Sequence, residues 1–141
     1  MSDELNPITG GCNCGAVRYA ISSAPLAVIA CHCTSCRKQS GAAHSVNIIV
    51  RATTMTVEGD LASYDDPDTA SGAPISREFC GACGSPIRSV PSAKPKIIAV
   101  KAGTLDEPSG YAPAMHIWMR SALPWVVLPE GMPRFETEPQ G

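Results

Sequence analysis

The sequence predicts a mainly β fold built from short strands, with a single short helix. Glycine (12 residues) and proline (13 residues) interrupt this 141-residue chain too often for a bundle of long helices. Segments rich in β-branched residues recur between Gly, Pro and Thr, which is the composition of short strands. Few stretches show the apolar periodicity of an amphipathic helix. These three observations favour short elements joined by many turns.

The expected strands follow from β-branched or alternating segments. In chain order they cover residues 16–21, 45–51, 55–57, 75–80, 86–90 and 96–101. Apolar and polar residues alternate in both 75–80 and 86–90, so the two are predicted to be the arms of a hairpin. The connection contains Gly81-Ala-Cys-Gly84, which places a thiol in the turn and a glycine where a positive φ is needed.

One short helix is expected in the first third of the chain. Thr34 or Ser35 is suited to cap its N-terminus, Cys36–Gln39 would form its body, and Ser40-Gly41 would end it.

Two polar segments are expected to lie in solvent. The stretch 65–74 is predicted to be a loop whose carboxylates Asp65, Asp66 and Asp68 are hydrated. The C-terminal residues 136–141 have little to bury and are expected to fray. With no internal repeat and no linker, residues 1–141 are predicted to form a single domain.

Charge and composition narrow the possible partners. Lys plus Arg number 11 and Asp plus Glu number 13, a net charge of −2, which disfavours nucleic acid and anionic membrane surfaces as partners. The acidic N-terminus lacks the features of a signal peptide. The least polar early stretch, 24–31, contains Pro25 and falls well short of the roughly 20 residues that span a bilayer. We therefore expect a cytoplasmic protein without a membrane segment.

The chain contains 7 cysteines, an odd number that a closed disulfide framework would not use fully. They fall into three groups: Cys12/Cys14, Cys31/Cys33/Cys36 and Cys80/Cys83. In a reducing compartment, clustered cysteines more often bind metal or perform catalysis than form disulfides. A structural zinc takes four ligands, whereas a catalytic zinc keeps three protein ligands and one open position.

The spacing divides the seven thiols into four and three. The pairs Cys12/Cys14 and Cys80/Cys83 both lie beside glycines that let a loop curl around an ion, so together they predict a closed zinc site. Cys31, Cys33 and Cys36 would hold a second zinc with an open position, which is typical of a reactive site. The helix N-terminus and Arg37 favour the thiolate form of Cys36.

The residues alone leave two alternatives for the middle group. It is a second structural zinc site if His32, His44 or His116 supplies a fourth ligand, and a redox site if Cys33 and Cys36 form a disulfide. We expect His32 to point away from the metal and to pair with the backbone. His44 and His116 are expected to be satisfied, partly buried histidines.

Three cysteine-bearing segments, 10–19, 31–41 and 79–87, resemble the glutathione-dependent formaldehyde-activating enzyme (GFA) family. The segments 101–106, 116–118 and 123–125 support the resemblance, and the matches run from about residue 10 to about residue 135 in the family's order. The resemblance implies an Mss4-like β-tent of short antiparallel strands with two zinc ions per chain. Cys12, Cys14, Cys80 and Cys83 would hold the structural zinc, and Cys31, Cys33 and Cys36 the second. His44 departs from the aromatic residue expected in the family.

The same resemblance implies a carbon–sulfur lyase that condenses formaldehyde with glutathione to S-hydroxymethylglutathione, or cleaves it. Candidate pocket residues are Thr34, Ser35, Arg37, His44 and Trp118, with Arg37 suited to a substrate carboxylate. The alternative is a non-catalytic zinc-binding module, chaperone-like or for protein interactions. It would expose Trp118, Trp125 and Val126 as an apolar patch, whereas we expect these residues to lie in the core.

Overall fold

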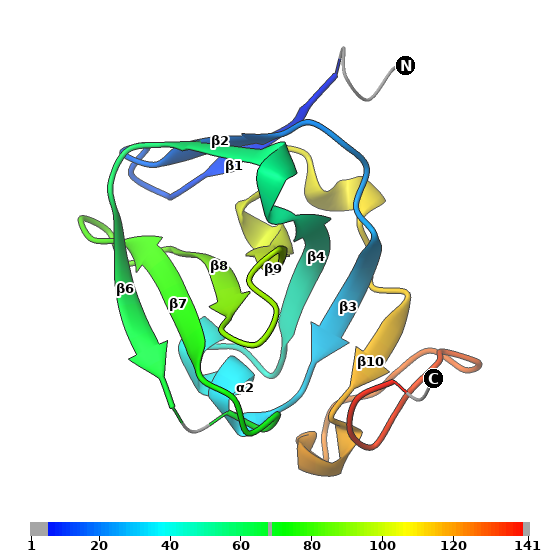
Figure 1. Ribbon diagram of the computed structural model, residues 1–141. Coiled ribbons are helices and arrows are strands. Elements are labelled where there is room, and N and C mark those ends of the chain that lie inside the picture. The colour runs from blue at the N-terminus through cyan, green and yellow to red at the C-terminus, as the bar shows by residue number, and fades with distance from the viewer. Residues whose placement is uncertain (1–5, 68, 140–141) are drawn as a thin grey trace.

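The computed structural model describes residues 6–67 and 69–139, and within them it is mainly β (Figure 1). A three-stranded sheet has the order β1-β2-β5, and a seven-stranded sheet has the order β10-β3-β4-β9-β8-β7-β6. The strands are β1 (Ile8–Gly11), β2 (Arg18–Ile21), β3 (Ala27–Cys31), β4 (Ser45–Arg51), β5 (Met55–Glu58), β6 (Leu61–Asp66), β7 (Ile75–Cys80), β8 (Pro86–Pro91), β9 (Ile97–Lys101) and β10 (Met115–Ile117). The predicted fold class of short strands with one α-helix, α2 (Thr34–Ser40), is confirmed.

Most neighbouring strands are antiparallel, and their positions follow from hairpins and short connections. The predicted thiol-bearing hairpin is confirmed as β7 and β8, in which Arg77 lies opposite Ser89. The pair β3 and β10 departs from the expected antiparallel arrangement, because these strands run parallel with His116 opposite Ala30. This pairing brings the C-terminal part of the chain beside the middle cysteine group (Figure 1).

The helix α2 begins at Thr34, two residues before the expected first helical residue Cys36, because Cys33 is its N-cap. The Cys33 Sγ accepts a hydrogen bond from the Cys36 backbone N–H at 3.3 Å, so the expected capping by Thr34 or Ser35 is wrong. The predicted end of the helix is confirmed. Gly41 has φ 70°, and its N–H donates to the carbonyl of Arg37 at 2.9 Å.

The polar segments differ from the expectation of solvated loops. Asp66 belongs to β6 and is buried, since it is paired with Arg77, while its neighbour Asp65 is exposed. Asp68 lies outside the described residues. At the C-terminus, the carbonyls of Glu136 and Thr137 accept hydrogen bonds from the backbone of the 119–121 region and of Trp118, so these two residues are not frayed.

The main hydrophobic core joins both sheets. Its fully buried side chains include Ile21 of β2, Ile48 of β4, Ile87 of β8 and Val100 of β9. The β1–β2 hairpin lies across the end of the large sheet opposite α2 (Figure 1). This leaves the α2 end of the large sheet free to form a pocket.

The expectation that the two tryptophans and Val126 form part of the core is wrong. Trp125 is 68% exposed, and Val126 is only half-buried. Trp118 has φ 58° and packs instead against Cys31, Cys33 and Cys36. Its unusual backbone conformation therefore occurs beside a cluster of reactive groups.

Candidate metal centres and the adjoining pocket

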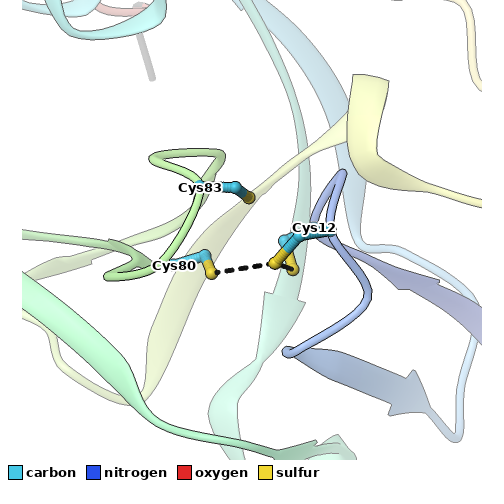
Figure 2. Close-up of side chains that lie close together, drawn as sticks. Cys12, Cys80 and Cys83 are labelled. Atoms are coloured by element: carbon cyan, nitrogen blue, oxygen red, sulfur yellow. Dashed lines mark hydrogen bonds between the residues drawn. The ribbon is translucent and has the colours of Figure 1, made fainter.

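The first cysteine centre joins two loops that are distant in the sequence. Cys12 and Cys14 come from the β1–β2 connection, while Cys80 and Cys83 come from the end of β7 and the turn after it. Figure 2 shows Cys12 facing Cys80 and Cys83. The Sγ atoms of Cys12 and Cys14 lie 3.6 Å apart, and those of Cys14 and Cys80 lie 3.8 Å apart. All four lie within 4.8 Å of one another. Tetrahedral zinc with Zn–S bonds of about 2.3 Å needs S···S separations of roughly 3.8 Å, so the geometry is compatible with zinc.

Backbone groups prepare this centre for negative charge. The N–H of Val17 donates to Cys12 Sγ at 3.2 Å, and the N–H of Ala82 donates to Cys80 Sγ at 3.4 Å. The bond from Val17 lowers the pKa of Cys12, and the hydroxyl of Ser85 lowers the pKa of Cys83 to about 5. The positive φ expected at Gly84 is confirmed at 83°. Cys12 and Cys83 are thereby favoured as thiolates, the form that binds a metal, whereas hydrogen bonds to these two thiols raise the pKa of Cys14 to about 11.

The second cysteine centre is buried at the start of α2. Cys31 ends β3, Cys33 caps the helix and Cys36 lies in its first turn, with their ligand atoms within 4.8 Å of one another. Within residues 6–67 and 69–139, no histidine, carboxylate or further cysteine joins this group. Both cysteine groups therefore lie together as the spacing predicted, four in one and three in the other.

The three thiols share negative charge unequally. Hydrogen bonds from Cys31 and Cys33, together with the charges of Arg77 and Lys101, lower the pKa of Cys36. Donation to Cys33 and Cys36, together with burial, raises the pKa of Cys31. Without a cation, the cluster thus concentrates its charge on Cys36. A divalent cation would allow all three to ionise, so the donor set fits zinc.

These thiols open onto a cavity of about 420 Å³ between the large sheet and the neighbouring loops. Its polar lining includes Asn47, Ser89, Arg77 and Lys101. Of the residues expected to line a pocket, Trp118 does so, whereas Thr34, Ser35, Arg37 and His44 do not. Arg37 lies instead in a separate hollow with Trp125.

Arg77, and not the predicted Arg37, is the arginine that lines the cavity beside the thiols. It is 2% exposed, with its Nε 3.2 Å from Asp66 Oδ2 and its Nη1 3.2 Å from Ser89 Oγ. Nη1 also lies 3.9 Å from Cys36 Sγ. Residues two apart in a strand lie on the same face, so Arg77 shares a face of β7 with Ile75. This alternation was the signal in the sequence that could have indicated where Arg77 lies.

Lys101 is the second cation beside the thiols. It is 6% exposed, and burial lowers its pKa, an effect that the negative charge of Cys36 opposes. It ends β9, opposite Asn47 of β4. The pocket therefore combines a soft, electron-rich group with two buried positive side chains.

The ion pair of Arg77 predicts a large effect of Asp66→Asn on stability. The substitution leaves the Arg77 charge buried without its counterion, which should lower the free energy of unfolding by about 3–5 kcal/mol. Urea denaturation measures the change. The exposed neighbour Asp65→Asn is the matched control and should cost less than about 0.5 kcal/mol. Equal stability of the two variants would contradict the role of the pair.

The histidines are arranged differently from the expectation. His32 does not pair through its ring with the backbone, because its Nε2 lies 2.8 Å from Nδ1 of His116. The Nδ1 atoms of His32 and His44 are buried and have no hydrogen-bond partner. The histidines thus form a group of their own rather than completing either cysteine centre.

All seven cysteines are free in this structure. Among the described residues, no helix has both the length and the apolar character required to cross a bilayer.

The chain is similar to known proteins over most of its length. The family model described as "Glutathione-dependent formaldehyde-activating enzyme" matches residues 7–121. A Halomonas elongata protein named "Putative glutathione-dependent formaldehyde-activating enzyme" is 27% identical over 124 residues, which cover 84% of this chain and 79% of that protein. A crystal structure of a Rhodobacter sphaeroides protein has a TM-score of 0.57 and 19% identity. The match covers 90% of this chain and 98% of that one, and it supports the fold alone.

Proposed function

The chain belongs to the glutathione-dependent formaldehyde-activating enzyme family, and from this premise we propose that it is a zinc-dependent carbon–sulfur lyase. The reaction adds the sulfur of a thiol to the carbonyl carbon of a small aldehyde, or runs in reverse. The S–C bond forms as the C=O π bond breaks, and the thiol proton ends on the new hydroxyl oxygen. Glutathione and formaldehyde, which the Halomonas relative's name includes, are the proposed substrates.

One observation carries this proposal: three buried thiols without a fourth protein ligand among the described residues lie in a cavity lined by Arg77 and Lys101. A volume of about 420 Å³ lies within the usual range of small-molecule sites, roughly 300–1,000 Å³. The closed four-thiol centre offers no comparable space for a substrate, because four ligands complete a tetrahedral zinc. The chemistry therefore belongs to the middle group.

Each of the two cysteine centres is proposed to hold one zinc ion. Cys12, Cys14, Cys80 and Cys83 would hold the structural ion, and Cys31, Cys33 and Cys36 would hold the reactive one. When bound, the second ion favours ionisation of a thiol and polarises a carbonyl. We also propose that residues 1–141 act as one domain in the cytoplasm, where seven thiols stay reduced.

The chain's own cations have distinct roles in this proposal. Arg77 is committed to Asp66 and Ser89, so it holds positive charge near Cys36 without needing a substrate. Lys101 lines the cavity and is suited to bind a carboxylate of glutathione. It would orient the thiol toward the cysteine centre while the apolar wall of the cavity excludes water.

The test measures formaldehyde-dependent loss of free thiol above the spontaneous rate, with glutathione or the uncharged 2-mercaptoethanol as substrate. Lys101→Met should raise KM for glutathione by about 10-fold or more, since a charged hydrogen bond contributes roughly 1.5–3 kcal/mol. The KM for 2-mercaptoethanol should change little. Lys96→Met, an exposed lysine outside the pocket, is the control.

Two outcomes would contradict the proposal in different ways. If the zinc-loaded wild type does not exceed the spontaneous rate with any thiol, the lyase assignment is wrong and the non-catalytic zinc module is favoured. If turnover is present but Lys101→Met affects both thiols equally, Lys101 does not recognise a carboxylate.

A further inference from the structure

A third group of potential metal ligands consists of the three histidines of the chain. His32 follows β3, His44 immediately precedes β4, and His116 is the central residue of β10. One ring nitrogen from each lies within 4.8 Å of the others, and the shortest contact is 2.8 Å, between His32 Nε2 and His116 Nδ1. The ring centroids are 4.5 to 5.4 Å apart. Three segments therefore converge on one small volume.

Backbone hydrogen bonds hold the main chain of two of these histidines in place. The His32 N–H donates to the carbonyl of Ile117 at 3.0 Å, next to His116 in the parallel pairing of β3 with β10. On its other side, His116 exchanges backbone hydrogen bonds with the C-terminal segment, from its N–H to Pro133 and from Phe135 to its carbonyl. The site is thus largely pre-organised in the fold.

Burial leaves this group incompletely satisfied. His32 is 0% exposed and His116 is 4% exposed, while the buried Nδ1 atoms of His32 and His44 lack hydrogen-bond partners. A buried nitrogen without a partner is unfavourable, and coordination of a cation through His44 Nδ1 would satisfy that atom, while His32 would coordinate through Nε2, the nitrogen that faces His116. Neutral imidazole is the form that binds metal.

We propose that His32, His44 and His116 form a third metal centre, separate from both cysteine centres, for a borderline divalent cation such as Zn²⁺, Co²⁺ or Ni²⁺. Tetrahedral zinc with Zn–N bonds of about 2.0–2.1 Å needs N···N separations of roughly 3.3 Å, within reach of small ring movements. Three imidazoles suit these metals and leave a coordination position for water. His44 is only half-buried and provides the side from which the ion enters.

One nearby charge opposes the cation. The guanidinium of Arg134 acts on His116 and is held by the carbonyls of Met132 and Pro129, each at 3.1 Å. Arg134 is exposed, so solvent screens its repulsion. Among the described residues, the histidine nitrogens form a group separate from the thiols.

The test counts zinc ions bound per chain after equilibrium dialysis of the intact protein, by elemental analysis and native mass spectrometry. The wild type should bind three ions and His44→Phe should bind two. Phenylalanine keeps an aromatic ring in place beside His32 but removes both nitrogens. His44→Gln provides a second variant, and the thermal melting curve checks that each remains folded.

Cobalt substitution identifies which centre is lost. Thiolate-to-cobalt charge-transfer absorption should be the same in wild type and His44→Phe, because only the histidine centre changes. Equal metal counts in the two proteins would overturn the proposal. A parallel fall in the charge-transfer band would also overturn it, by showing that His44 completes a cysteine centre. Turnover is measured separately, since this metal count does not depend on the proposed lyase activity.

Discussion

Replacing Cys80 with serine is expected to unfold the protein or to lower its stability severely. The Cys80 side chain is 1% exposed and belongs both to the hydrophobic core and to the four-thiol centre. The centre links the β1–β2 connection to the β7–β8 turn, which are also joined by a hydrogen bond from the Asn13 N–H to Ser85 Oγ at 3.0 Å. A structural zinc contributes roughly 10–16 kcal/mol of binding free energy, comparable with a whole domain's stability of about 5–15 kcal/mol.

Thermal denaturation and zinc content measure this effect together. Cys80→Ser should lose one zinc per chain and at least about 3 kcal/mol of stability, which lowers Tm by roughly 10 °C in a chain of this size. Ala82→Ser is the matched control, since this exposed residue lies in the same turn and the substitution leaves all four thiols and Ser85 in place. An unchanged Tm with full zinc content in Cys80→Ser would show that the four-thiol centre does not stabilise the fold.

The same turn shows which parts of the fold can be predicted from the sequence. Alternation within 75–80 and 86–90, with glycines between, was sufficient for the β7–β8 hairpin, because these contacts are local. The expected bounds of β4 were also confirmed. In contrast, β3 and β10 were missed, since β10 has only three residues and is stabilised by pairing with a strand far away in the sequence. Such non-local pairing overrides the preferences of short segments.

In the candidate site, too, the features set by local sequence could be predicted and those set by distant strand pairing could not. Spacing along the chain was sufficient to predict each cysteine pair and the trio, because each needs only a tight loop or one helical turn. The joining of the two distant pairs was predicted from the four ligands that a closed zinc site takes. Arg77, Lys101 and the histidine group come together through pairings of β7 with β8, β9 with β4, and β10 with β3. Their meeting depends on strand order in the large sheet, which no local pattern encodes.

Cys36→Ser is expected to abolish most of the activity while leaving the fold intact. Cys36 is the thiol on which the cluster concentrates its negative charge, with Arg77 Nη1 at 3.9 Å from its Sγ and Lys101 nearby. Serine is a poor ligand for zinc, because its hydroxyl does not ionise near pH 7 as a thiol does. Removing even an outer contact of a metal ligand typically costs 10–100-fold, so loss of a ligand should lower kcat/KM by at least about 100-fold.

The fold should survive because the structural centre and the main core are untouched, and the N-cap contact from Cys33 Sγ to the Cys36 N–H uses the backbone. The assay compares kcat/KM, Tm and zinc content in Cys36→Ser with those in Lys38→Ala, an exposed substitution on the same helix. Lost turnover with an unchanged Tm would tie the chemistry to this centre. Full turnover in Cys36→Ser would contradict the proposal, because it would show that the reaction does not need the intact three-thiol centre.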